Sequence, residues 1–254
     1  MPETLLLTKL FVPPLRPNLV PRPRLLKQLS AGMKGALTLI SAPAGYGKTT
    51  LIGEWRAGPG AEVPLAWLSL DAGDDDSARF WPYFFTALNT IQEGLADEAL
   101  SLFNAFQLPS IETLLTILMN DLICFSQDFV LVLDDLHVIT KPKVHQMLAY
   151  LLDHLPKQMH VVILTRADPP LPLARLRVSG QLVDIRQEDL RFTPAEATTF
   201  LNDVMGLELK ADDIVALKAR TEGWIAGLQL AALSLLGQED PSEVIATFGG
   251  GYHY

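Results

Sequence analysis

The sequence feature that most constrains the fold is a loop of small residues at positions 42–47. Residues 42–49 read APAGYGKT; they follow the apolar run ALTLIS and precede a helical pattern that begins near Lys48. A loop between a strand and a helix turns successive backbone N–H groups toward one point, where the positive end of the helix dipole also lies. Gly45 and Gly47 permit backbone torsions and a close approach that a side chain would obstruct. We therefore predict a phosphate-binding loop (P-loop) in an α/β fold.

Each side chain at the end of this loop has an expected partner. Lys48 would reach the β and γ phosphates of a nucleoside triphosphate, Thr49 would coordinate Mg²⁺, and Thr50 would reach the α phosphate. Ala42 stands where the strict pattern G-x-x-x-x-G-K-[ST] has glycine, but this position needs a small residue more than it needs a positive φ. We expect ATP or ADP with Mg²⁺ as the ligand. The residues predicted to cradle it are Ala44, Gly45, Tyr46, Gly47, Lys48, Thr49 and Thr50.

A second motif is VLVLDDLH at 130–137, a hydrophobic strand that ends in two aspartates. Asp134, at the carboxyl end of this strand and beside the strand of the P-loop, is expected to hold Mg²⁺ through its water shell. Asp135 is expected to polarise the attacking water. Either motif alone has a surface turn as its simpler explanation, whereas the two together favour a nucleotide site.

A third element is Arg166, directly after the apolar run HVVILT. Because the carboxyl ends of parallel strands meet at one crevice, its guanidinium is expected to touch the γ phosphate and to sense hydrolysis. The alternative is a helix cap or an interdomain ion pair. Arg175 and Arg177, in the next segment, are further candidates for the same face, and the sequence does not choose between them.

Short apolar runs alternate with helical patterns, as in βαβ units with a parallel sheet. We predict strands at 36–41, 65–70, 129–134, 160–165 and 182–186. A helix with an aromatic face should start behind Ser77 as N-cap, with Pro82 in its first turn, and Thr193 with Glu196 should form a capping box for a later helix. Further helices are predicted at 111–125, 144–155, 194–205, 212–220, 224–236 and 242–248.

The change of pattern after Arg186 divides the chain into three expected parts. They are an N-terminal arm at 1–30, an α/β nucleotide domain at 31–190 and a small helical domain at 191–254, which we expect to be truncated at its C-terminus. The last residues read GGGYHY, with no element to cap the helical part. We therefore expect the chain to belong to a longer protein.

Composition and charge exclude several classes of protein. The formal net charge is −9 and the chain has a single cysteine, Cys124, so we expect neither a nucleic-acid-binding surface nor an internal disulfide. No run approaches 18 apolar residues and no secretory segment is present, which indicates a cytoplasmic protein with no membrane span. The five histidines lack zinc-ligand spacing.

Three smaller features have ordinary structural explanations. Cys124 is read as a small core residue. The acidic run at 71–76 is read as a solvated helix entry rather than a calcium loop. The basic N-terminal stretch is read as a solvated, extended arm that packs on the domain, in preference to a nucleic-acid contact; its cations are Arg16, Arg22, Arg24 and Lys27.

Taken in order, these segments resemble the N-terminal ATPase module of MalT-like regulators. These are large ATP-binding LuxR-type transcription factors of the STAND class of signal-transducing P-loop NTPases. The likeness covers nearly the whole chain and is more specific than the P-loop alone. It rests on TKLFVPPLRPNLVPRPRL at 8–25, SAPAGYGKTTL at 41–51, WLSLDAGDDDSARFWPYFFTAL at 67–88, LVLDDLH at 131–137, LTRADPPLPLARLRVSGQL at 164–182, DLRFTPAEA at 189–197 and TEGWIAGLQLAAL at 221–233.

The resemblance implies a P-loop NTPase fold of the AAA+-like, STAND type: a parallel five-stranded sheet flanked by helices, followed by a small helical domain. The strand carrying Arg166 would separate the Walker B strand, which ends at Asp134, from the strand of the P-loop. The GWIAGLQ helix, with Trp224 and Ile225, would close over the nucleotide. Ile225 replaces a proline found in many relatives, so the adenine wall should have a different shape. The segment implied to line the adenine is Leu19, Val20, Pro21 and Arg22.

The resemblance also implies a function and partners. ATP would favour an open form in which the full-length protein self-associates, and ADP a closed form. Helical repeats would bind an inducer and a C-terminal helix-turn-helix would bind DNA, but neither is present here, so this chain should not bind DNA. The favoured function is a slow regulatory ATPase. A metabolic P-loop kinase and a module that holds ADP remain the alternatives.

Overall fold

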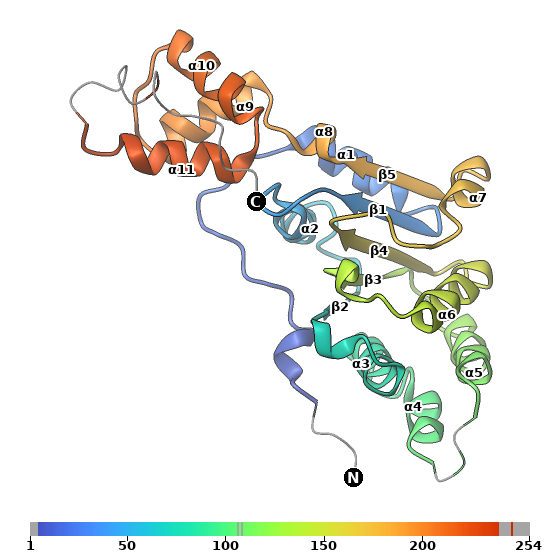
Figure 1. The fold of residues 1–254 in the computed structure, drawn as a ribbon. Coiled ribbons are helices and arrows are strands. Elements are labelled where there is room, and N and C mark those ends of the chain that lie inside the picture. The colour runs from blue at the N-terminus through green and yellow to red at the C-terminus, as the bar shows by residue number, and fades with distance from the viewer. Residues whose placement is uncertain (1–4, 106, 108, 239–244, 246–254) are drawn as a thin grey trace.

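The computed structural model describes residues 5–105, 107, 109–238 and 245, and it centres on a five-stranded parallel sheet (Figure 1). The strand order is β2-β3-β4-β1-β5. Each predicted strand is confirmed, with ends that differ by at most one residue, because the central strands are continuous apolar runs that suit a sheet covered on both faces. The strands are β1 Leu37–Ser41, β2 Leu65–Ser69, β3 Phe129–Asp134, β4 Met159–Thr165 and β5 Leu182–Arg186.

The order of the strands fixes which side chains meet at the carboxyl edge. Ser41, the last residue of β1, is paired with Thr165 of β4 and with Arg186 of β5, and Ser69 is paired with Asp134 of β3. Strand β4 lies between β1 and β3. The expectation that Asp134 sits on the strand next to the P-loop strand is therefore wrong, whereas the order implied by the resemblance is correct.

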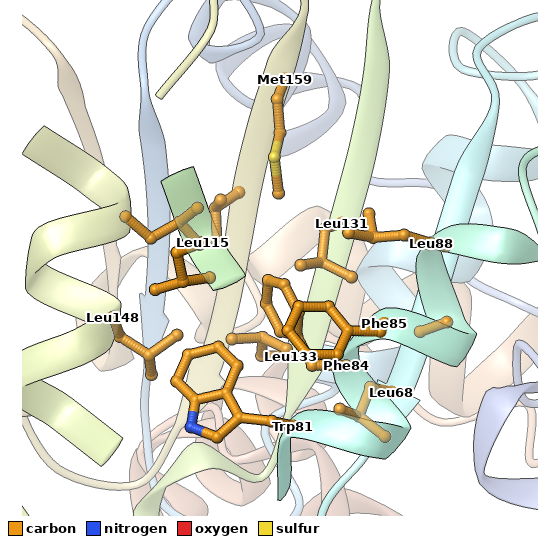
Figure 2. Close-up of a cluster of buried hydrophobic side chains, with 14 of the residues drawn as sticks. Leu68, Trp81, Phe84, Phe85, Leu88, Leu115, Leu131, Leu133, Leu148 and Met159 are labelled. Atoms are coloured by element: carbon orange, nitrogen blue, oxygen red, sulfur yellow. The ribbon is translucent and has the colours of Figure 1, made fainter. Parts of the chain in front are cut away.

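Helices cover both faces of the sheet. Alternate strand residues face opposite sides, so that Val130 and Val132 pack with α1 and α2 while Leu131 and Leu133 pack with the helices on the other face. Figure 2 shows this second face, where Trp81 of α3 lies among leucines of β3, α5 and α6. The helices are α1 Pro23–Gly32 and α2 Lys48–Ala57 on one face, and α3 Ser77–Asn89, α4 Asp97–Phe103, α5 Ile111–Ile123, α6 Pro142–Asp153 and α7 Leu173–Val178 on the other.

Two predictions about these helices are wrong in detail. The N-cap of α3 is Asp76, whose carboxylate accepts from the N–H of Ala78, so Ser77 is the first helical residue and Pro82 lies in the second turn rather than the first. Cys124 is exposed rather than part of the core, because α5 ends at Ile123 and the cysteine follows as its C-cap.

The chain after β5 forms a separate helical layer beyond the carboxyl ends of β1 and β5 (Figure 1). The capping box of Thr193 and Glu196 is confirmed, but the helix predicted at 194–205 is a short α-helix that continues as a π-helix. The helix predicted at 242–248 lies outside the described residues except for Ile245. The elements are α8 Gln187–Leu190, α9 Pro194–Thr198, the π-helix Thr199–Val204, α10 Ala211–Thr221 and α11 Ile225–Leu235.

The N-terminal arm is anchored by an ion pair with the acidic run at 71–76. Lys9, in the 3-10 helix η1 Leu7–Leu10, bonds the fully buried carboxylate of Asp74 and lies 2.8 Å from Asp71. Asp75 accepts hydrogen bonds from the hydroxyl and backbone N–H of Thr140. The prediction of a solvated helix entry is therefore wrong at Asp74, which is buried in the fold, whereas Asp71 and Asp76 are exposed and Asp76 caps α3. Among the described residues, no helix is long and apolar enough to cross a bilayer.

Candidate functional site

The loop at 42–47 has the backbone geometry that its glycines predict. Gly45 and Gly47 have φ of 79° and 74°, in the left-handed region that favours glycine. Ala42 has no positive φ and its side chain is buried, so alanine meets the requirement at this position. Helix α2 starts directly after Gly47 and points its N-terminus into the loop.

Lys48 reaches back over the loop. Its Nζ donates to the carbonyl oxygens of Ala42 at 2.8 Å and Pro43 at 3.1 Å. Burial lowers the pKa of Lys48, and the positive charge of Arg166 lowers it further, against the opposing effects of Asp135 and Asp134. The ammonium is thus a partly desolvated donor held by weak neutral acceptors, for which phosphate oxygens would be stronger partners.

Thr49 and Asp134 join the P-loop to the end of β3. The Thr49 hydroxyl donates to Asp134 Oδ2 at 3.1 Å. The other oxygen, Oδ1, is buried and has no hydrogen-bond partner within the described part of the chain. Burial, followed by the charge of Asp135, raises the pKa of Asp134 to about 6. A hydroxyl and a carboxylate with a free oxygen form the hard donor set that Mg²⁺ prefers, so these residues fit the predicted ion. In the described residues, no group of three histidine, cysteine, aspartate or glutamate side chains could hold a metal.

Asp135 and Arg166 directly follow β3 and β4, two neighbouring strands, at the carboxyl edge of the sheet. Asp135 has a φ of 60°, and its Oδ1 lies 3.6 Å from Nδ1 of His137. Arg166 is exposed at the end of β4, and its charge lowers the pKa of both Lys48 and His137. The charges of Asp135 and Arg166 therefore both act on Lys48. Their roles toward a nucleotide remain predictions.

The other two arginine candidates form ion pairs elsewhere. Arg175 pairs with Asp153 at the end of α6, and Arg177 pairs with Asp184 within β5. Arg186 was not predicted as a residue of this edge of the sheet. It ends β5 opposite Ser41 and pairs with Asp168 in the loop after Arg166. Its position at the end of a predicted strand was the available signal.

A cavity of about 520 Å³ opens beside the loop. It is shared by the N-terminal arm, the P-loop and the helical layer, and it includes the predicted residues Leu19, Val20, Arg22 and Ile225, whereas Pro21 is exposed. The lining from 16–18 and 192–205 was not predicted, because it is assembled by tertiary packing and carries no local motif. Ala226 and Gln229 were not named individually, but they belong to the GWIAGLQ helix that was expected to close over the nucleotide. The lining residues are Arg16, Pro17, Asn18, Leu19, Val20, Arg22, Gly45, Gly47, Thr50, Phe192, Phe200, Val204, Met205, Ile225, Ala226 and Gln229.

The start of α11 lies directly on the P-loop. The Trp224 indole donates to the carbonyl of Ala44 at 3.0 Å, and the N–H of Ala226 donates to the carbonyl of Gly45 at 3.1 Å. The ring of Tyr46 lies 6.4 Å from that of Trp224. Trp224 therefore contacts the loop itself, and any contact it makes with a nucleotide remains a prediction.

Arg22 connects the arm to the same loop. Its side chain is buried, its Nη2 donates to the carbonyl of Gly47 at 3.2 Å, and its backbone N–H donates to Glu54 at 3.0 Å. Burial lowers the pKa of Arg22, although Glu54 opposes this. The arm thus packs on the domain as expected, but Arg22 is buried against α2 rather than solvated.

Known proteins resemble the chain in sequence and in fold. Residues 23–164, more than half of the chain, match the model of the AAA ATPase domain family. The HTH-type transcriptional regulators MalT of Serratia proteamaculans and Yersinia pestis are each 37% identical over 227 residues, which is 89% of this chain. The chain spans 25% of the length of these curated relatives.

A solved structure has the same fold. It is a signal transduction ATPase with numerous domains (STAND) that carries a tetratricopeptide repeat sensor, from Pyrococcus horikoshii. Its TM-score is 0.61 at 17% identity, covering 90% of this chain and 31% of that one. The chain therefore belongs to the AAA ATPase domain family, as a MalT-like ATPase module with the fold of a P-loop NTPase.

Proposed function

We propose that the chain is a nucleotide-dependent switch that binds Mg-ATP and ADP and slowly hydrolyses ATP. The observation that carries this proposal is the hydrogen bond between Thr49 and Asp134, beside Lys48, on a loop whose Gly45, Gly47 and Thr50 line a cavity built by three separate parts of the chain. The hydroxyl, the carboxylate and the ammonium are the groups that a metal-bound triphosphate requires. Membership of the AAA ATPase domain family supports the same ligand.

The proposed reaction is the transfer of the γ phosphoryl group to water. The water oxygen bonds to the γ phosphorus, the bond to the β–γ bridging oxygen breaks, and ADP and inorganic phosphate are formed, with one water proton released. Asp135 would orient this water by accepting a hydrogen bond, while Lys48 and Arg166 would offset charge on the phosphates. A bound Mg²⁺ would supply charge neutralisation between the β and γ oxygens.

The switch proposal rests on how the cavity is built. Val20 of the arm, Gly47 of the P-loop and Ile225 of α11 all line it, so a ligand inside contacts all three parts. Loss of the γ phosphate would change the charge next to Lys48, Asp135 and Arg166. A ligand shifts such an arrangement only by its difference in affinity for the two forms. The ATP and ADP states would therefore differ in how tightly α11 lies on the loop.

The proposed output is self-association of a longer regulator. The MalT relatives are named as HTH-type transcriptional regulators, and this chain spans a quarter of their length. We infer that the module serves such a regulator, in which DNA binding resides in a helix-turn-helix elsewhere. Neither the inducer nor the operator follows from the residues of this module.

The test is the nucleotide that the purified chain carries and what the chain does with it. Denaturation followed by chromatography should release ADP or ATP, and single-turnover incubation with Mg-ATP should slowly yield ADP and phosphate. Turnover that rises sharply with a small phosphate acceptor would favour a kinase. The strand order argues against one, because metabolic P-loop kinases usually place the Walker B strand next to the P-loop strand, whereas here β4 lies between β1 and β3. Bound ADP that never exchanges would favour a module that only holds nucleotide.

A further inference from the structure

His137 is a side chain of the candidate site to which neither the P-loop nor the aspartates assign a role. It lies in the 3-10 helix η3 Leu136–Val138, which follows β3. Its Nδ1 is buried and has no hydrogen-bond partner among the described residues, and it lies 3.6 Å from Oδ1 of Asp135. A buried imidazole nitrogen without a partner is costly unless another state of the site satisfies it.

The backbone between the two residues produces this approach. Asp135 adopts a φ of 60°, a left-handed conformation that costs a side-chain-bearing residue about 1 kcal/mol. This turn directs the Asp135 carboxylate toward the ring two residues later instead of away from it. The strained backbone of Asp135 therefore accompanies a close approach of its carboxylate to the imidazole of His137. At 3.6 Å the two groups are just beyond hydrogen-bond distance.

The other groups that face His137 carry positive charge. Burial lowers the pKa of His137, Asp135 opposes this, and Arg166 and Lys48 lower the pKa further. A neutral imidazole has one N–H to donate, and on Nδ1 this N–H would point at the carboxylate.

We propose that His137 is a positioning residue for ATP hydrolysis, and that its Nδ1–H closes onto the Asp135 carboxylate and aims the second carboxylate oxygen at the attacking water. The proposal rests on the proposed function, since it needs a chain that hydrolyses ATP. His137 acts through Asp135 and takes no proton from water. Its loss should therefore affect the rate of the chemical step and leave nucleotide binding intact.

The test compares three substitutions in the full chain under single-turnover conditions with Mg-ATP. His137→Ala should slow hydrolysis by about ten- to a hundredfold, the usual result when a group that orients a catalytic side chain is removed. His137→Asn keeps an N–H donor near the place of Nδ1 and should restore most of the rate. His137→Gln places its amide farther out, near the place of Nε2, and should rescue less. The apparent affinity for ATP should stay within about twofold throughout.

A double-mutant cycle separates positioning from a general structural defect. In an Asp135→Asn background, His137→Ala should change the rate by less than about twofold, because the residue through which it acts is already altered. His154→Ala, at an exposed histidine after α6, is the matched control and should behave as the parent chain.

Two outcomes would overturn the proposal in distinguishable ways. A parent chain that hydrolyses ATP and a His137→Ala variant with the parental rate would remove the role of His137 alone. Additive effects in the double-mutant cycle would also reject action through Asp135. A parent chain that binds Mg-ATP but forms no ADP would overturn hydrolysis itself, and with it this role.

Discussion

Lys48 is the residue whose charge the site can least replace. Its ammonium now bonds two loop carbonyls, and charge-assisted hydrogen bonds to phosphate contribute roughly 1.5–3 kcal/mol each. Lys48→Ala should therefore weaken ATP binding by a few kcal/mol and nearly abolish it in calorimetry. Lys157→Ala, at an exposed lysine before β4, is the control. Unchanged affinity of the Lys48 variant for Mg-ATP would rule out the P-loop assignment.

A substitution at Asp135 should separate nucleotide binding from ATP hydrolysis. Asp135→Asn removes a carboxylate that would orient water, while Asp134 and Thr49 keep their hydrogen bond for the metal. The variant should bind ATP with parental affinity and retain it, with hydrolysis slowed by about a hundredfold or more. Asp128→Asn, an exposed residue just before β3, is the matched control. Hydrolysis at the parental rate would move the role of positioning water to another side chain.

His160 should make stability depend on pH. Its ring is buried in β4, with Nδ1 2.8 Å from the carbonyl of Gly35 and Nε2 2.9 Å from the hydroxyl of Thr38. The carbonyl can only accept, so Nδ1 carries the proton and Nε2 accepts from Thr38 in the neutral ring. Burial lowers the pKa of His160, although the bond to Gly35 opposes this.

A histidine whose pKa is lower in the folded state stays neutral while the unfolded chain takes up a proton. The pH-dependent contribution of His160 to the free energy of unfolding is therefore absent above pH 6.5, and it becomes unfavourable to the folded state as the pH falls below 6.5. Between pH 7 and pH 5.5, the free energy of unfolding should fall more in the parent than in His160→Gln. Urea unfolding at both pH values measures this difference. Equal pH dependence in the two chains would contradict the assignment.

Among the elements, the strands were predictable and several helices were not. Strands such as β3 are uniformly apolar because both faces are covered, and this pattern is visible without any tertiary information. Helices α1, α4, α7 and α8 were missed. Two of them, α7 and α8, are only 6 and 4 residues long, too short for helical periodicity to register.

The residues of the candidate site likewise divide into those that a local sequence pattern identifies and those that it does not. Residues 42–50 and 130–137 are contiguous motifs, so the sequence identifies them, and the structure brings them together at Thr49 and Asp134. The far wall of the cavity, including Phe200 and Gln229, comes from segments that lie over 140 positions away and pack there only in the folded chain. No local pattern could have named Phe200, whereas Gln229 belongs to the GWIAGLQ helix that the resemblance placed over the nucleotide.

The contact between α11 and the P-loop is a testable coupling at the level of elements. A Cβ added at Gly45 would lie 2.6 Å from Cβ of Ala226 and 2.7 Å from Nε1 of Trp224, so Gly45→Ala should push the start of α11 off the loop. Amide hydrogen exchange should become faster in Ile225–Leu235 and should show this displacement.

The control separates this clash from backbone strain. Gly180 also has a positive φ, of 69°, but a Cβ there would meet nothing within 4 Å. Gly180→Ala should therefore cost only the conformational penalty of about 1 kcal/mol, with no local change in α11. Similar exchange in α11 for both variants would mean that the helix does not depend on the loop.

At the scale of the whole molecule, the N-terminal cations are tied to the chain itself. Arg22 is buried on Gly47, Arg24 donates to the carbonyls of Asp189 and Arg191, and Arg16 donates to Gln229. Lys27 is exposed. The basic stretch therefore joins the arm to the P-loop and to the helical layer, and only Arg22 is buried, while Arg16, Arg24 and Lys27 are exposed.

The last prediction concerns DNA. Affinity for duplex DNA is dominated by cationic contacts that displace counterions, and specific binding assembles several of them on one surface. The formal net charge of −9 opposes such binding, and Arg24 of the basic stretch is hydrogen-bonded within the chain. We therefore predict that this chain does not bind duplex DNA at physiological salt, with or without ATP. Gel-shift titration with random and promoter-like duplexes tests this, and Lys27→Ala identifies any residual contact. Saturable, salt-sensitive binding at micromolar protein would show that the arm contacts nucleic acid, and DNA recognition could no longer be assigned to another part of the regulator alone.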